Sequence, residues 1–334
     1  MAFSKIGDSA LITDPVKIRQ DISSLALHSA VADNKAAYNL TNMFIDQFED
    51  DSGIATETNT DRNSSEYVSS STTAQAEISY SGGTAAASSS AGGGYAASTA
   101  FANNTNQFAT ANGTNDTDTW YLSMDFGSGN EKIITGYSLD VGGSTFGGGA
   151  PWAWTFRGAD NEGLGTNAVV KDTVSNNNGE SNPYSANFLT STTSKRYWGL
   201  NVTLSGSNNY IYVTELNLMH TVTTVNATAT VIGNTQTASS SQTKVSGVML
   251  YKDNSGTATI GTDLKIYFSC DNGSNWTEAS SYGTVSPVFS TGVKMIRLGD
   301  TTCTAGTQIK YKAVWANQSS GSKETQLHGI GMNF

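Results

Sequence analysis

The sequence is poor in charged residues, proline, histidine and cysteine. Charged side chains make up 14% of the 334 residues, well under the ~25% of an average soluble domain. Four prolines stand against 34 glycines, and the remaining polarity comes from Ser, Thr and Asn. This composition favours short strands and turns over long helices, because β-branched and turn-forming residues are poor helix formers.

Basic residues are scarce as well, and the net charge of −10 excludes nucleic acid as an expected partner, because an acidic surface repels phosphates. The first five residues are not followed by an apolar run, so no secretory signal is expected. No stretch approaches the ~18 apolar residues of a membrane-spanning helix. We therefore expect a chain made in the cytoplasm, without membrane insertion.

Residues that carry catalysis or bind metals are also few. The two cysteines, Cys270 and Cys303, match no disulfide framework or zinc site. We interpret them as free, buried thiols that could pair only if their Cα atoms lay ~4.4–6.8 Å apart. The three histidines lack metal-ligand spacing, and no common catalytic motif occurs. The sequence predicts a non-enzymatic protein; paired glycosidase carboxylates, which need only spatial proximity, are the alternative.

A helix is indicated near the N-terminus, where Asp14 can cap and Pro15 suits the first helical position. Apolar or small residues follow at spacings of mostly three and four: Ile18, Ile22, Leu25, Ser29, Ala32, Ala36, Leu40, Met43 and Phe44. A lone helix cannot bury such a stripe. Residues 1–50 are therefore predicted to be a helical anchoring and oligomerisation segment, with a homotrimeric bundle favoured and packing on the chain's own β-domain as the alternative.

The rest of the chain is predicted to be mainly β. Residues 51–76 are acidic and then rich in Ser, Thr and Asn, which favours a linker. Short alternating or β-branched runs bounded by Gly, Asn or Ser then recur, which is typical of sandwiches and jelly rolls. The expected fold is an N-terminal α-helical segment followed by two β-sandwich or jelly-roll domains, at 77–221 and 222–334.

Residues 100–219, within the domain expected at 77–221, resemble discoidin-type domains, the coagulation-factor type C family with a galactose-binding-like jelly roll. The segments that carry the resemblance, in family order, are 100–105 (AFANNT), 120–127 (WYLSMDFG), 134–139 (ITGYSL), 151–160 (PWAWTFRGAD), 195–202 (KRYWGLNV) and 214–218 (TELNL).

That family holds ligands with loops at one end of the sandwich, and the resemblance places these loops near 101–108, 142–152 and 180–188. It implies a glycan site with stacking from Phe146, Trp152 and Tyr184 and hydrogen bonds from Arg157 and Asn182. Capping of the sandwich by the same aromatic residues is the alternative. It also implies a structural calcium ion at Asn103, Asn104, Thr105 and Glu215. Asn replaces a typical Asp in that loop, which lowers the ligand charge.

Further segments resemble modules of phage virion proteins: 32–40 (ADNKAAYNL), 44–54 (FIDQFEDDSGI), 250–253 (LYKD) and 316–325 (ANQSSGSKET). Together these resemblances imply a tailed-phage structural protein located in the virion. It would be a tail-fibre or baseplate-type homo-oligomer, bound to other virion proteins through residues 1–50 and to host-surface polysaccharide through its sandwiches. A capsid decoration protein and a polysaccharide-degrading tailspike are the alternatives.

Residues 269–276 (SCDNGSNW) also fit the Asp-box pattern of sialidases. In that pattern the Asp accepts hydrogen bonds from turn amides, the Gly takes a positive φ, and the Trp packs underneath. We interpret it as a structural hairpin and not as a catalytic feature.

Overall fold

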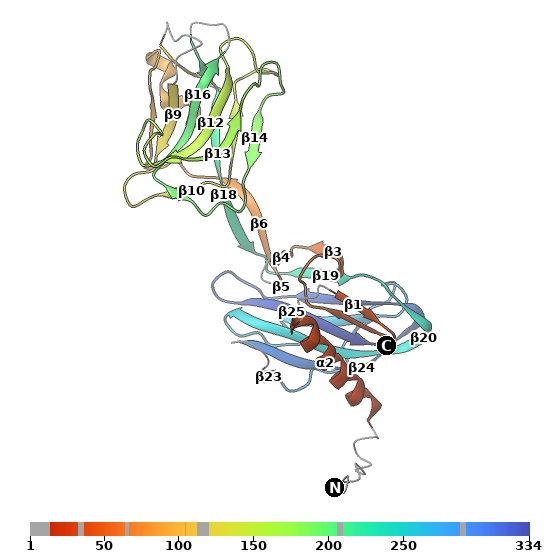
Figure 1. The fold of residues 1–334 in the computed structure, drawn as a ribbon. Coiled ribbons are helices and arrows are strands. Elements are labelled where there is room, and N and C mark those ends of the chain that lie inside the picture. Colours follow the sequence, from red (N-terminus) through yellow and green to blue (C-terminus); the bar gives the residue numbers. More distant parts are fainter. Residues whose placement is uncertain are drawn as a thin grey trace, which may run out of the picture. The chain divides into compact units, whose positions relative to one another are not determined.

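The computed structural model describes residues 14–32, 37–63, 67–103, 105–111, 120–205, 210–287 and 292–334. Within these ranges it holds one α-helix and otherwise strands, with two short 3₁₀ helices (Figure 1). The expected mainly β fold class with an N-terminal helix is confirmed. No helix in the described ranges is long and apolar enough to cross a membrane.

The chain divides into two compact units, and the first is discontinuous in sequence. It combines Met1–Thr73 with Thr223–Phe334, and the second unit is Ala74–Val222. The expectation of a separate linker at 51–76 is wrong, because this segment forms strands of the first unit at 54–58, 61–63 and 67–69 and begins a strand of the second unit's sheet at residue 71. Its β3 (Ile54–Thr58) pairs with β19 (Ala229–Gly233), a partner far along the chain. Ser- and Thr-rich segments occur in strands as well as in linkers. Only the pairing with the distant strand β19 shows that this segment forms a strand.

The first unit is built on one extended sheet with the order β1-β2-β25-β20-β24-β19-β3. β24 pairs with β20 over its first two thirds and with β21 and β19 over its last residues, so it joins the two parts of the sheet. The strands of this unit are β1 (Ala37–Leu40), β2 (Met43–Asp46), β3, β4 (Asp61–Asn63), β5 (Tyr67–Ser69), β19, β20 (Gln236–Ser255), β21 (Leu264–Ser269), β22 (Thr277–Glu278), β23 (Ser286–Pro287), β24 (Val293–Trp315) and β25 (Glu324–Asn333).

The core of the first unit mixes both ends of the chain. Phe44, Phe48 and Val68 from the N-terminal part pack with Phe268 and Trp315 from the C-terminal part. The N-terminal segment is therefore a structural part of this unit, and the C-terminal domain expected at 222–334 is completed by residues before it.

The helix α2 (Pro15–Ala32) begins where the sequence predicts, with Asp14 Oδ1 accepting hydrogen bonds from the Val16 and Lys17 amides at 3.1 and 3.0 Å. The helix ends at Ala32, and residues 37–40 and 43–46 form strands. The prediction that the helical stripe continues to Phe44 is therefore wrong beyond Ala32.

The side of α2 that packs on the chain's own sheet carries Gln20, Ser23, Leu27 and Ala30, all buried. Gln20 Nε2 donates to the Leu298 carbonyl at 2.8 Å. Packing on the chain's own β-domain, the alternative for this segment, is what the structure has.

The 269–276 hairpin joins β21 to β22, and its expected structural role is confirmed. Asp271 Oδ1 accepts from the Asn275 amide at 2.9 Å, and Gly273 has φ of +85°. The bonds from Asn275 lower the pKa of Asp271 to about 2. The Trp276 ring lies beside Gly273 and carries the Lys312 ammonium 4.7 Å from its centroid.

The second unit is a sandwich of a five-stranded sheet, β13-β12-β16-β9-β7, and a four-stranded sheet, β14-β11-β18-β6. Two strand pairs, β10-β15 and β8-β17, extend it. Its elements are β6 (Ser71–Glu77), β7 (Thr84–Ala87), η1 (Gly93–Tyr95), η2 (Ala97–Phe101), β8 (Phe108–Ala109), β9 (Trp120–Asp125), β10 (Lys132–Ile133), β11 (Gly136–Asp140), β12 (Pro151–Ala159), β13 (Val169–Val174), β14 (Tyr184–Asn187), β15 (Ser194–Lys195), β16 (Tyr197–Ser205), β17 (Tyr212–Val213) and β18 (Glu215–Val225).

Aromatic side chains fill the space between these two sheets. Trp154 and Phe156 on β12 both point into the core, as their alternation predicts, and are 1% and 0% exposed. Phe156 stacks between Tyr137 and Trp198, with ring centroids 4.1 and 5.8 Å away. Such large rings supply most of the apolar area that a small sandwich can bury.

Candidate functional site

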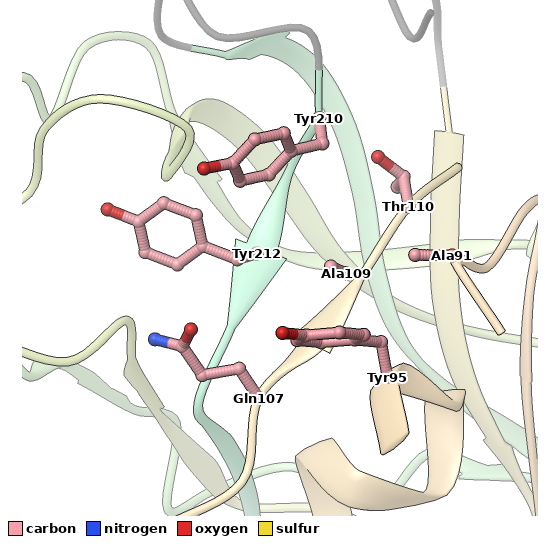
Figure 2. Close-up of a pocket in the computed structure, with 7 residues that line it drawn as sticks. All are labelled: Ala91, Tyr95, Gln107, Ala109, Thr110, Tyr210 and Tyr212. Atoms are coloured by element: carbon pink, nitrogen blue, oxygen red, sulfur yellow. The ribbon is translucent and has the colours of Figure 1, made fainter. Parts of the chain in front are cut away.

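A cleft of about 350 Å³ opens on the surface of the second unit. Its lining residues are uncharged: Ala91, Tyr95, Gln107, Ala109, Thr110, Tyr210 and Tyr212. Figure 2 shows the rings of Tyr95, Tyr210 and Tyr212 around Ala109, with the Gln107 amide at the edge of the same space. The cleft thus combines three aromatic faces with several hydrogen-bonding groups.

The strand pair β8-β17 holds the cleft in place. Its register sets Tyr212 opposite Ala109, and the chain next to the pair is fixed by two hydrogen bonds between Thr110 and Ile211. The Thr110 amide donates to the Ile211 carbonyl at 2.9 Å, and the Ile211 amide donates to Thr110 Oγ1 at 2.8 Å. Ile211 is 1% exposed, so the alternation of an extended chain turns Tyr210 and Tyr212 outward.

The Tyr212 side chain is held in place by a hydrogen bond, while Tyr95 and Tyr210 are accessible to solvent. The Tyr212 hydroxyl donates to the Gly147 carbonyl at 3.0 Å, and burial raises the pKa of this phenol, with a smaller contribution from Tyr210. Tyr95 and Tyr210 are 50% and 44% exposed. A ligand would therefore meet two accessible rings beside a rigid third.

These groups can bind a ring-shaped polyol. Aromatic faces stack against apolar C–H faces, and phenol and amide groups exchange hydrogen bonds with hydroxyls. The seven lining residues include no Asp, Glu, His, Cys or Lys side chain. The aromatic rings and hydrogen-bonding groups of this cleft suit ligand binding.

The cleft adjoins two of the loops in which a ligand was expected, since Gln107 lies in 101–108 and Gly147 in 142–152. Its three tyrosines were nevertheless not predicted. The pattern Tyr210-Ile211-Tyr212, with one apolar residue between two aromatic residues before a strand, is the signal that could have indicated outward-facing rings.

The aromatic residues that were expected to stack on a sugar lie mainly in the core. Phe146 is 1% exposed and stacks on Trp154 at 5.8 Å, so its assignment to a glycan site is wrong. The Tyr184 ring lies edge-on to Trp154 at 5.2 Å, and its hydroxyl donates to Asp172 Oδ2 at 2.8 Å. Capping of the sandwich, the alternative for these rings, describes both residues.

The polar groups expected at the same site serve the loops and strands around them. Asn182 Nδ2 donates to Asp140 Oδ1 at 2.7 Å. Arg157 Nε donates to Thr155 Oγ1 at 2.9 Å, and burial lowers the pKa of its guanidinium. Trp152 is half-buried and its Nε1 has no partner in the described part of the chain. The structure does not bring these residues together with the tyrosine cleft.

The expected calcium residues lie near a second acidic side chain that was not predicted. Asn103, with φ of +48°, donates from Nδ2 to Glu77 Oε2 at 3.0 Å. Burial raises the pKa of the Glu215 carboxyl, with a further contribution from the negative charge of Glu77. Thr105 is exposed, and Asn104 lies outside the described residues.

Three buried oxygens in this region have no hydrogen-bond partner in the described ranges: Glu77 Oε1, Glu215 Oε1 and Asn217 Oδ1. Two carboxylates and an amide oxygen form a donor set that suits a hard cation such as calcium. Among the described residues, no group of three or more His, Cys, Asp or Glu side chains is arranged to hold a metal ion.

No family model matches the sequence, and no curated protein matches it either. Solved structures similar to the chain include chitosan-binding module 1 of a chitosanase/glucanase from Paenibacillus sp. IK-5, at 23% identity over 40% of this chain and 92% of that chain, with a TM-score of 0.33. Another is the family 32 carbohydrate-binding module of NanJ from C. perfringens, solved with galactose, at 18% identity over 44% and 100%, with a TM-score of 0.34.

A third is a Clostridium perfringens module solved with GalNAc-β-1,3-galactose, at 14% identity over 43% of this chain and 99% of that chain, with a TM-score of 0.33. All three are carbohydrate-binding modules by their names, and each is matched over nearly its whole length by less than half of this chain.

Proposed function

We propose that the chain is a non-enzymatic attachment protein that binds an uncharged glycan in the cleft formed by Tyr95, Tyr210 and Tyr212. The observation that carries this proposal is the cleft itself: two half-exposed rings beside a fixed one, lined only by uncharged residues. Clustered open aromatic rings are otherwise unfavourable on a protein surface, which supports a role in binding.

The setting we propose is the virion of a tailed phage, in a tail-fibre or baseplate-type component. The sequence segments that resemble phage structural modules support this setting. The first unit, which contains all four of those segments, would bind other virion proteins, and the second unit would face host polysaccharide. Labelling the intact particle with an antibody to the second unit tests the position, and labelled heads would favour the capsid decoration protein.

The calcium ion belongs to the same proposal. Glu77, Glu215 and Asn217 would hold it, and it would neutralise the repulsion between the two carboxylates. An ion at this place would stabilise the region around Asn103 at the start of the sandwich.

The cleft is tested by isothermal titration of the full chain with galactose, N-acetylgalactosamine and chitotriose, followed by a glycan array. We expect Tyr210→Ala and Tyr95→Ala each to weaken the binding of any sugar found by about tenfold, which is about 1.4 kcal/mol for one lost stacking face. Tyr210→Phe keeps the ring and should bind more tightly than Tyr210→Ala.

Trp152→Ala is the matched control, because Trp152 is a half-buried aromatic residue of the same unit outside the cleft. Binding that survives both tyrosine changes and is lost in Trp152→Ala would refute the cleft and restore the site expected from the sequence. New reducing ends in host glycans incubated with the protein would show that it is an enzyme, the tailspike alternative.

A further inference from the structure

The helix α2 has a second apolar side that its own sheet leaves uncovered. Ile18, Ile22 and Leu25 are 41%, 49% and 71% exposed, although α2 packs on β2, β20 and β25 through its other side. At 100° per residue, the exposed and the buried sides are centred roughly 150° apart on the helix. A helix that only has to cover one sheet needs one apolar side.

The spacing of the exposed side is that of a coiled coil. Ile18, Ile22, Leu25 and Ser29 are separated by four, three and four residues, which is the alternation of d and a positions in a heptad. This seam of Ile18, Ile22 and Leu25 follows the 3.5-residue period that helices use to pack along one another.

We propose that the seam joins three copies of this chain into a parallel trimer, with the three α2 helices at its axis and each first unit outside. Isoleucine at both an a and a d position, as at Ile22 and Ile18, favours three helices over two. The proposed partner is therefore a second and a third copy of the same chain.

The charges beside the seam indicate the parallel orientation. In the same register Asp14 occupies a g position and Arg19 an e position five residues later, and both are exposed. A parallel neighbour sets g against the following e, which places Asp14 opposite Arg19 of the next copy. In an antiparallel pair the N-terminal end of one helix meets the C-terminal end of its neighbour, so Asp14 and Arg19 would not face each other. Arg19 makes no ion pair within the described part of the chain, so its guanidinium is available.

Association through this seam starts from an ordered helix. α2 is already capped by Asp14 and held on its sheet by Gln20, so joining copies does not have to form the helix first. The proposal goes beyond glycan binding and does not depend on it. A trimer would however carry three clefts, and linked clefts raise the overall affinity for a repetitive polysaccharide.

The mass of the full chain, measured by light scattering over a dilution series, tests the trimer. We expect three times the chain mass for the unchanged protein. Replacing Ile22 and Leu25 by Lys should raise the concentration at which the trimer dissociates by at least about tenfold. Val170→Lys is the control, since Val170 is 49% exposed, as Ile22 is, but lies on β13 of the second unit; this variant should remain a trimer.

A monomer or a dimer at every concentration overturns the proposal, and so does a trimer that the Ile22 and Leu25 changes leave intact. Arg19→Glu is a second variant that keeps the apolar seam but places a negative charge opposite Asp14 of the neighbouring copy. It should also favour the monomer, with an unchanged helical circular dichroism signal. Because neither variant alters cleft residues, sugar binding by the separated chains shows whether the proposed cleft works independently.

Discussion

Asp46 at the end of β2 makes the stability of the first unit depend on pH. Its carboxyl is fully buried and accepts hydrogen bonds from the Phe48 amide at 2.8 Å and from the Tyr311 hydroxyl at 3.3 Å. Burial outweighs these bonds and raises the pKa of Asp46 from 3.8 to about 7. At neutral pH this carboxyl is therefore close to half protonated in the folded chain.

The direction of the effect follows from proton binding. Between pH 4 and pH 7 the folded state keeps a proton on Asp46 that the unfolded state has lost, so the free energy of unfolding falls as pH rises through this window. A shift of about three pKa units corresponds to about 4 kcal/mol. The stabilising contribution is complete below about pH 4 and is lost above about pH 7.

Asp46→Asn removes the titration and keeps both neighbours satisfied, because the amide can accept from the Phe48 amide and donate to the Tyr311 hydroxyl. We expect the variant and the unchanged protein to be equally stable near pH 4 and the variant to be more stable by up to about 4 kcal/mol at pH 8. The measurement is urea unfolding from pH 4 to pH 8, followed by hydrogen exchange of peptides from β2 and β25, which report the first unit. A difference between the two proteins that does not change with pH would refute the reasoning.

Two further changes test the second unit. If calcium binds between Glu77 and Glu215, adding it at about 100 times its dissociation constant should stabilise this unit by about 2.7 kcal/mol. Thermal unfolding with calcium and with a chelator measures this stabilisation. An identical increase in the Glu215→Gln variant would contradict the assignment. Gly199→Ala should destabilise the sandwich by about 1–3 kcal/mol in urea unfolding, because a Cβ there would clash with the Leu122 carbonyl on the paired strand β9. Gly163→Ala is the control, because a Cβ at that position would make only ordinary van der Waals contacts. This variant should unfold as the unchanged protein does.

The sequence alone was sufficient for the features that depend on near neighbours. Asp14 caps α2, Trp154 and Phe156 alternate into the core, and Asp271 and Gly273 form the hairpin turn, each as its local pattern predicts. Caps, strand alternation and turn dihedrals are set by residues within a few positions of one another.

Whether a given side chain is buried or exposed could be determined only from the tertiary structure. Within the segment 51–76, β3 is a strand because it pairs with β19. Phe146 is a core residue because it stacks on Trp154. The stripe of Ile18, Ile22 and Leu25 was visible in the sequence, but the sheet under α2 covers the opposite side. The tyrosine cleft likewise arises from β8 and β17, about 100 residues apart, and such long-range pairing leaves no periodic signal in the sequence.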